Sequence, residues 1–197
     1  RIKQAPSVED LAGLYIEHWA KPRKRSWAED DRILKREVLP AIGEMLIEDV
    51  RRRDINALLD VIVGRGATVQ ANRTLAVVRK MFNFAISRDL IENNPCYAVK
   101  QPTVESARDR VLSDSEVEKF LTGLPDTTMW TPTQLALLCV LATAQRCGEV
   151  LNARWQDIDL DAGWWTLPKG KTKNKLAHRV PLSDPTLRIL ELAHALG

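Results

Sequence analysis

The stretch from residue 68 to 87 constrains the fold most, because its apolar side chains recur every three or four residues over about five helical turns. Leu75 and Phe82 belong to this apolar face, while Arg73 and Lys80 fall on another face. An amphipathic helix of this kind buries its apolar face against neighbouring helices. Its basic face is left for an anionic partner.

Three more helices are expected before this one. Ser7 followed by Asp10 has the capping-box pattern at the start of the first. Pro22 and Pro40 should end the first and second helices, since proline cannot donate the hydrogen bond that an interior helical residue makes. The expected ranges are 8–22, 27–38 and 54–64. Residues 1–95 are therefore predicted to form a helical bundle.

The second half changes character. Residues 102–110 are polar, charged and without periodicity, which is typical of a linker between domains, and we take 96–109 as that linker. Ser113 with Glu116 begins a further helix, and Thr131 before a proline begins another. The latter is apolar on every side over 135–142, so we expect it to be buried in a second domain, 110–197.

Strand composition follows. Residues 163–167, with two tryptophans and a threonine, and residues 177–182, around Val180, have the composition of strands, and the stretch between them is rich in lysine. We expect a small β-hairpin with a basic tip and, from Ser183 onward, one more helix. The predicted fold class is mainly α with a small β-hairpin or sheet.

Composition excludes several classes of protein. Apolar residues make up 45% and charged residues 28% of the 197, which is typical of globular domains. Cys96, Cys139 and Cys147 are an odd number without zinc-binding spacing, so neither a disulfide scaffold nor a metal site is expected. The longest apolar run, 135–142, is too short to cross a bilayer. We therefore expect a cytoplasmic protein without a cofactor, and we interpret the chain as a fragment because it ends inside an apolar-periodic segment.

Basic side chains are grouped in three places. Five lie between Asp60 and Asp89, five lie between Asp161 and Asp184, and neither interval contains an acidic residue. The third group is at 21–25. Such groups are expected where a protein contacts a phosphate backbone, although a solvated surface is the other interpretation. The candidate DNA-binding residues drawn from these groups are Lys21, Arg23, Lys24, Arg25, Arg73, Lys80, Lys173 and Lys175.

Arg146 directly follows the apolar helix. A guanidinium at the edge of a core needs an anion, which is either Glu149, three residues on, or a ligand phosphate. On this spacing alone, a local structural pair and a phosphate-binding arginine both remain open.

The order of four motifs resembles the tyrosine recombinase, or phage integrase, family. The motifs are Thr-Ala-Gln-Arg-Cys-Gly-Glu at 143–149, Arg-Trp-Gln-Asp-Ile-Asp at 154–159, a Lys-Thr-Lys hairpin at 171–173 and His-Arg-Val-Pro-Leu-Ser at 178–183. The first 95 residues look like the helical core-binding domain of that family. The residues from 110 onward look like the N-terminal part of its α+β catalytic domain.

The resemblance implies roles for individual residues. Arg146 takes the place of the family's first catalytic arginine, which would hold the phosphate, and Glu149 that of the acid that orients it. Lys171 is implied as the general acid for the leaving sugar oxygen. Lys173 is the alternative, because counting forward from the first strand and back from the second gives different lysines. Ala144 stands where the family more often has glycine.

The resemblance further implies an activity and partners. The intact protein would be a site-specific DNA recombinase that integrates or excises a mobile element through a 3′-phosphotyrosine intermediate. Its partner would be double-stranded DNA at an attachment-site core, with a homotetramer acting in the nucleoid and no membrane contact. Neither Tyr15 nor Tyr97 matches the family's nucleophile, so the 197 residues alone are expected to bind DNA without cleaving it.

Two other classes of protein remain open. One is a non-catalytic DNA-binding regulator or excision factor, in which Arg146 and Lys171 only contact the DNA backbone. The other is a helical protein-interaction domain whose basic groups are solvated. We interpret His178 as a structural residue of the second strand.

Overall fold

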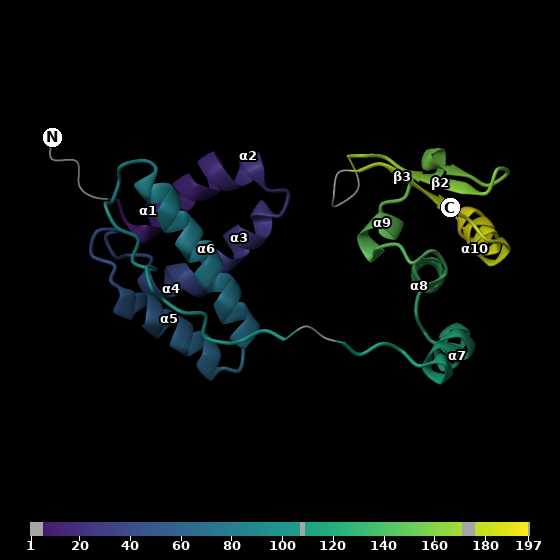
Figure 1. Ribbon diagram of the computed structural model, residues 1–197, viewed down its shortest axis with the longest axis horizontal. Coiled ribbons are helices and arrows are strands. Elements are labelled where there is room, and N and C mark those ends of the chain that lie inside the picture. The colour runs from purple at the N-terminus through teal and green to yellow at the C-terminus, as the bar shows by residue number, and fades with distance from the viewer. Residues whose placement is uncertain (1–5, 107–108, 171–175, 197) are drawn as a thin grey trace. The chain divides into compact units, whose positions relative to one another are not determined.

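The computed structural model describes residues 6–106, 109–170 and 176–196. It divides the chain into two compact units, Arg1–Arg108 and Asp109–Gly197 (Figure 1). The first unit consists of helices and their connections, and the second combines helices with a three-stranded antiparallel sheet. The predicted fold class, mainly α with a small sheet, is confirmed.

Consecutive helical elements join into two continuous segments at the start of the first unit, which we call arms. The first arm begins at α1 (Val8–Tyr15). The Ser7 hydroxyl accepts a hydrogen bond from the Asp10 backbone, and the Asp10 carboxylate accepts one from the Ser7 backbone at 2.9 Å. The predicted capping box is confirmed. The Ser7 backbone N–H and hydroxyl both donate to the Asp10 carboxylate, which holds the pKa of that carboxyl below its ordinary value. The arm continues through a wider turn, η1 (Ile16–Ala20), and ends with α2 (Lys21–Arg23), close to the predicted end.

The next arm differs from the prediction at its end. The helix α3 (Trp27–Ile33) begins where expected, but η2 (Leu34–Val38) and α4 (Leu39–Ile42) carry the helix past Pro40. In η2 the hydrogen bonds span five residues rather than four, so Pro40 falls at the start of a new turn, where its missing N–H is not needed. The prediction that this proline ends the helix was wrong for that reason.

The long helix α6 (Thr68–Ile86) contacts α1, α3, η2 and α5 (Arg52–Gly64), and Figure 1 shows it running through the first unit. Leu75 and Phe82 are buried, as predicted. The exposed residues of α6 form one narrow line along the helix, which we call the exposed stripe. Its members are Val69, Arg73, Ala76, Lys80 and Asn83.

The chain after α6 turns back along the same helix. Asn94 donates a hydrogen bond to the Asn83 side chain at 2.7 Å, and Arg79 donates to the Val99 carbonyl oxygen at 2.8 Å. Cys96 and Val99 are buried in the core of the first unit. The beginning of the segment predicted as a linker, 96–109, therefore packs on the first unit, because these apolar side chains find room in its core.

Asn72 holds a later part of the same segment. Its side chain is buried, and it donates to the Thr103 carbonyl oxygen and to the Glu105 carboxylate, both at 2.8 Å. It also accepts from the Thr103 backbone N–H at 3.3 Å. Both ends of a buried amide thus have partners, as they must to offset its desolvation.

Replacing Asn72 by alanine is expected to release residues 103–105 from α6, because three hydrogen bonds worth about 1 kcal/mol each disappear. Hydrogen–deuterium exchange at the Thr103 amide should become faster by at least about tenfold. Asn93→Ala, at an exposed asparagine, is the control. Unchanged exchange at Thr103 would contradict the role given to Asn72.

The second unit begins with α7 (Asp114–Gly123), whose capping box joins Ser113 to Glu116 as predicted. The Ser113 backbone N–H donates to the Glu116 carboxylate at 2.9 Å. The elements that follow are η3 (Leu124–Asp126), α8 (Thr131–Thr143), α9 (Cys147–Leu151) and η4 (Trp155–Asp157).

The sheet consists of β1 (Ile158–Asp159), β2 (Trp164–Leu167) and β3 (His178–Pro181), paired in that order. Trp165 pairs with Val180, and both are buried. The two predicted strands are therefore confirmed. The strand β1 is additional, because two residues are too few to show an alternating pattern in the sequence.

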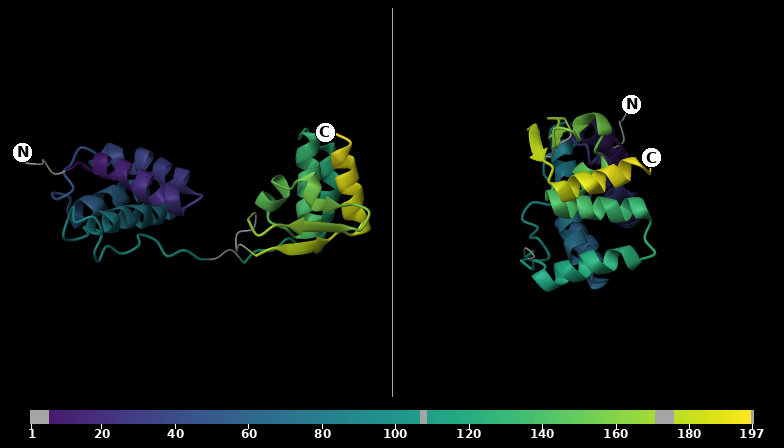
Figure 2. Two further views of the ribbon diagram at one scale, coloured as in Figure 1. Left: turned by 90° about the horizontal axis from the view of Figure 1, so that it is seen from above. Right: turned by 90° about the vertical axis from the view of Figure 1, so that its right-hand side faces the viewer.

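The apolar helix α8 is packed on one side. It lies beside α9 and α10 (Asp184–His194) (Figure 2), and its Leu135 and Cys139 are buried. Leu141, by contrast, is 42% exposed. The expectation of a helix buried on every side was wrong for the described part of the second unit, because the neighbouring helices cover only part of its circumference.

Candidate functional site

The exposed stripe of α6 presents two cations. Arg73 and Lys80 lie seven residues apart, about 10.5 Å along the helix axis. The Lys80 Nζ stands 4.6 Å from the centre of the Trp19 ring of η1, and the Arg23 guanidinium stands 5.9 Å from the same ring. Two candidate DNA-binding residues that are far apart in sequence therefore meet at one aromatic side chain.

Lys21 belongs to the helical segment that carries Trp19, and Arg25 lies in the turn that follows it. The Lys21 Nζ stands 4.9 Å from the centre of the Trp27 ring and forms an ion pair with Glu17. Arg25 is exposed. Cations over aromatic rings keep their charge at the surface while their stems cover apolar atoms. We call the following residues the basic–aromatic surface: Trp19, Lys21, Arg23, Arg73 and Lys80.

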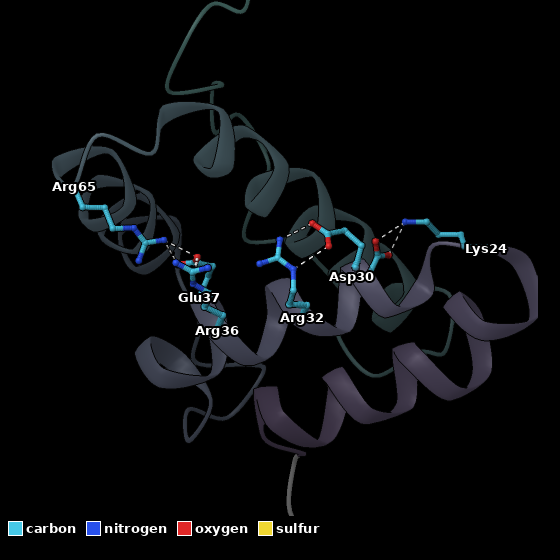
Figure 3. A network of polar contacts seen from close by, with 7 residues as sticks. Lys24, Asp30, Arg32, Arg36, Glu37 and Arg65 are labelled. Carbon is cyan, nitrogen blue, oxygen red and sulfur yellow. Dashed lines mark hydrogen bonds and ion pairs between the residues drawn. The ribbon is translucent and has the colours of Figure 1, made fainter. Parts of the chain in front are cut away.

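Lys24 points toward the interior instead. Its Nζ lies 2.5 and 2.7 Å from the two carboxylate oxygens of Asp30, whose side chain is only 5% exposed (Figure 3). The Tyr15 hydroxyl donates to the same carboxylate at 2.7 Å, and burial together with this bond raises the pKa of Tyr15 above its ordinary value. A buried carboxylate needs its cation. Lys24 therefore stabilises the fold, and we leave it out of the basic–aromatic surface.

Two arginines of the basic group between residues 60 and 89 also form hydrogen bonds within the first unit. Arg65 donates to both carboxylate oxygens of the buried Glu37 at 2.5 Å, and Arg36 lies 3.5 Å from the same carboxylate (Figure 3). Arg79 binds the backbone of the returning segment. The surface charge of this group is therefore smaller than the sequence indicates.

In the second unit, Arg146 stands directly before α9, and Glu149 lies in the first turn of that helix. The Glu149 carboxylate accepts from the Arg146 Nη1 at 2.8 Å and from the Arg146 backbone N–H at 3.2 Å. The Glu149 side chain is 5% exposed, whereas that of Arg146 is 57% exposed. A buried carboxylate thus fixes one part of a planar guanidinium that is otherwise open to solvent.

The turn before Arg146 is also fixed by its neighbours. Ala144 has φ 53° and ψ 23°, in the left-handed region. The Gln145 Nε2 donates to the Thr143 carbonyl oxygen at 3.0 Å, and the Gln145 Oε1 lies 3.1 Å from the Nε2 of His178, the first residue of β3. The turn is therefore joined to the sheet.

Ala144→Gly is expected to raise the free energy of unfolding by about 1 kcal/mol, because a residue with a Cβ is strained in the left-handed region and glycine is not. The greater freedom of glycine in the unfolded chain offsets part of this gain. Denaturant titration gives the difference. Ala142→Gly, inside α8, is the matched control and should lose stability by about 1 kcal/mol. Equal losses in both variants would contradict the left-handed turn.

The lysines predicted at the hairpin tip, Lys171, Lys173 and Lys175, lie outside the described residues. The strands on either side are described, and β3 begins at His178, beside the Arg146 turn. The choice between Lys171 and Lys173 stays a prediction.

In the ranges 6–106, 109–170 and 176–196, no group of three or more His, Cys, Asp or Glu side chains is arranged to hold a metal ion. None of the helices in those ranges is both long enough and apolar enough to cross a membrane.

The two units offer different chemistry. The Arg146 guanidinium can give parallel hydrogen bonds to an oxyanion such as phosphate, with Glu149 holding it in place. The basic–aromatic surface suits a longer polyanion such as a nucleic acid. Its cations can displace the counterions condensed on the polyanion, and its aromatic rings offer apolar contact.

Sequence reasoning identified Arg146 and Glu149 but did not identify Trp19 or Gln145. Trp19 has a usable signal, since it lies two residues before the basic group at 21–25. Gln145 has no such signal, because its partner His178 is 33 residues away.

Two protein-family models match the chain. Residues 9–102 match the phage integrase central domain, and residues 110–195 match the phage integrase family. The interval between the two matches contains the boundary between the two compact units.

The chain is also similar to individual proteins. It is 26% identical over 191 residues to prophage integrase IntA of Escherichia coli K12, and this match covers 93% of this chain and 46% of that protein. It is 34% identical over 145 residues to the shufflon-specific DNA recombinase of Escherichia coli, and this match covers 73% of this chain and 36% of that protein. The chain thus spans about half the length of such relatives, or less.

Among solved structures, the chain is similar to a lambda integrase tetramer bound to a Holliday junction. The TM-score is 0.78 at 19% sequence identity, and the match covers 98% of this chain and 57% of that one. The two chains share a fold.

Proposed function

Because the chain belongs to the phage integrase family of tyrosine recombinases, we propose that the intact protein is a site-specific DNA recombinase. It cuts and rejoins double-stranded DNA at an attachment-site core through a 3′-phosphotyrosine intermediate, in the integration or excision of a mobile element. Four copies act together on paired sites, in the cytoplasm and on the nucleoid. Relatives named as integrases and the likeness to DNA-bound lambda integrase support this proposal.

The observation that carries the proposal is the open guanidinium of Arg146 held by the buried Glu149 carboxylate. When a tyrosine oxygen attacks a DNA phosphodiester, negative charge gathers on the non-bridging oxygens. A planar guanidinium can hold two of these oxygens at once, which an ammonium group cannot do. Because Glu149 already restricts the arginine, little further ordering is needed when the phosphate arrives.

The leaving 5′-oxygen needs a proton, and we assign this step to the hairpin. Lys171 is the proposed general acid and Lys173 the alternative, with Lys175 as a backbone contact. The tyrosine hydroxyl releases its proton to solvent as its oxygen bonds to phosphorus, the bond from phosphorus to the 5′-oxygen breaks, and the 5′-oxygen takes the lysine proton. The strand that leaves the hairpin begins beside the Arg146 turn, which supports this assignment.

The first unit binds the DNA backbone through its basic–aromatic surface in this proposal. Lys80 and Arg23 gather at Trp19, and Arg73 extends the same stripe along α6. Arg25 adds a further cation in the turn between α2 and α3. These contacts provide affinity with little sequence preference, since they address phosphates rather than bases.

Protection of Cys147 from alkylation tests the phosphate site in the chain itself. Cys147 is exposed directly beside Arg146, so bound DNA should slow its reaction with a maleimide by at least about fivefold. Cys96 and Cys139 are internal controls, because burial raises the pKa of Cys96 to about 12 and that of Cys139 above its ordinary value. An Arg146→Ala chain should show little protection. Equal alkylation with and without saturating duplex would argue against a phosphate site here.

A nicked suicide substrate separates the recombinase from the non-catalytic regulator. The intact protein should form a covalent DNA adduct that survives a denaturing gel, because the released end cannot rejoin. A regulator that uses Arg146 only as a backbone contact binds the same duplex and gives no adduct.

A further inference from the structure

A hydrogen bond between Gln145 and His178 joins the turn that carries Arg146 to the sheet. Gln145 directly precedes Arg146, and His178 is the first residue of β3, so the bond spans 33 residues of sequence. The His178 Nε2 and the Gln145 Oε1 lie 3.1 Å apart, and both residues are half-buried.

The other partner of Gln145 fixes the direction of this bond. The Gln145 Nε2 donates to the Thr143 carbonyl oxygen at 3.0 Å, which leaves the Oε1 as the acceptor. The His178 Nε2 therefore carries a hydrogen and donates it. Gln145 thus ties its own turn together with one end of its amide and ties that turn to β3 with the other.

The Arg146 turn needs such support. Glu149 fixes the guanidinium relative to α9 alone, because the two residues belong to one helical turn. Ala144 is in the left-handed region, a strained conformation that persists only where its surroundings enforce it. Beyond the side-chain bond to Thr143, the Gln145 backbone N–H donates to the Thr143 hydroxyl at 3.4 Å.

We propose that Gln145 and His178 are positioning residues that set the place of Arg146 relative to the basic hairpin from which β3 emerges. The proposal rests on the proposed function, in which Arg146 and a hairpin lysine must reach the same phosphodiester. Gln145 and His178 act through Arg146 and do not touch the phosphate. A displacement of a reacting group by about 1 Å slows a reaction by up to about a hundredfold. One neutral hydrogen bond favours the positioned state by roughly a factor of five to ten, so losing the bond between Gln145 and His178 should slow cleavage by about tenfold.

Single-turnover cleavage of a nicked attachment-site duplex by the intact protein tests this role. His178→Gln keeps an amide donor near the place of Nε2, whereas the shorter His178→Asn places its amide near Nδ1 and does not reach Gln145. At saturating protein, His178→Asn and Gln145→Met should cleave about tenfold more slowly with unchanged DNA affinity. His178→Gln should stay within about twofold of the wild type.

Nuclear magnetic resonance of the 197-residue chain supplies a readout that needs no activity. In alkaline buffer, where free imidazole is neutral, the wild type should show a His178 Nε2–H signal that exchanges slowly with water. The signal should broaden or vanish in Gln145→Met while the helical circular dichroism stays the same. A persistent signal in that variant would overturn the assigned hydrogen bond.

Arg146→Ala in the same cleavage assay separates this proposal from the proposed function. Full cleavage by Arg146→Ala would mean that the phosphate site is wrong. Loss of cleavage in Arg146→Ala with normal rates in Gln145→Met and His178→Asn would mean that only the positioning role is wrong. Equal rates in His178→Gln and His178→Asn would also overturn it. If His178→Asn does not fold, Gln145→Met compared with His178→Gln decides the question.

Discussion

Under the proposed function, Arg146→Ala in the intact protein should slow DNA cleavage by about a hundredfold to a thousandfold on any substrate. Removing one preorganised donor from a developing oxyanion costs roughly 3 to 4 kcal/mol of transition-state stabilisation. Glu149, which remains in place, carries the wrong charge to substitute for the guanidinium. Single-turnover rates at saturating protein measure the loss without interference from DNA affinity.

Arg146→Lys is the matched control, because it keeps the charge and removes the planar fork. It should recover only part of the lost rate, since an ammonium group cannot hold two oxygens in parallel. Full activity in Arg146→Lys would show that charge alone is needed. Full activity in Arg146→Ala would remove this arginine from the mechanism.

Substituting the hairpin lysines should affect cleavage differently from substituting Arg146. Lys171→Ala should slow cleavage when the leaving group is a 5′-oxygen, but a 5′-sulfur leaves without a proton and should restore most of the rate. Lys173→Ala is compared in parallel and shows which lysine is the acid. If the 5′-sulfur substrate restores cleavage by Arg146→Ala equally well, or restores it in neither lysine variant, the general-acid assignment is wrong. The hairpin lysines would then only bind phosphates.

Reversing the charge of Arg73 and Lys80 together should weaken binding of duplex DNA by the 197-residue chain by roughly a hundredfold. Both residues lie on the exposed stripe of α6, where glutamates would face the phosphate backbone and repel it. The helical circular dichroism should not change, because neither side chain is buried. Titration of a labelled duplex at low salt gives the affinities.

Arg53→Glu with Lys119→Glu changes the net charge by the same amount at exposed positions that do not belong to α6. This control should bind nearly as well as the wild type. The dependence of the dissociation constant on salt adds a second measure, since neutral variants Arg73→Ala and Lys80→Ala should each lower the log–log slope by about 1. Equal weakening in both reversed pairs would mean that only net charge matters.

Much of the local structure could be predicted because its causes lie within a few residues. The capping boxes at Ser7 and Ser113 were readable, since both partners are three residues apart. The two faces of α6 were readable from helical periodicity. The pair of Arg146 and Glu149 belongs to the same class, because its geometry follows from one helical turn.

The end of the second arm could not be predicted in the same way. A proline normally ends a helix, but a wider turn at η2 places Pro40 where no donor is required. Such a turn has no sequence signature of its own, because it depends on how the arm packs against α6.

The sequence by itself determined that this chain is mainly helical, that it carries groups of basic residues and that Arg146 has an acidic partner nearby. Only the tertiary structure decided which of those bases form ion pairs with buried carboxylates inside the first unit. Lys24 is bound to the buried Asp30, and Arg65 to Glu37, which is 28 residues away in the chain. A count of charges along the sequence compares each base only with its neighbours in the chain. Charge neutralisation falls off with distance in space, so a carboxylate brought close by folding can bind a base that has no acid near it in sequence.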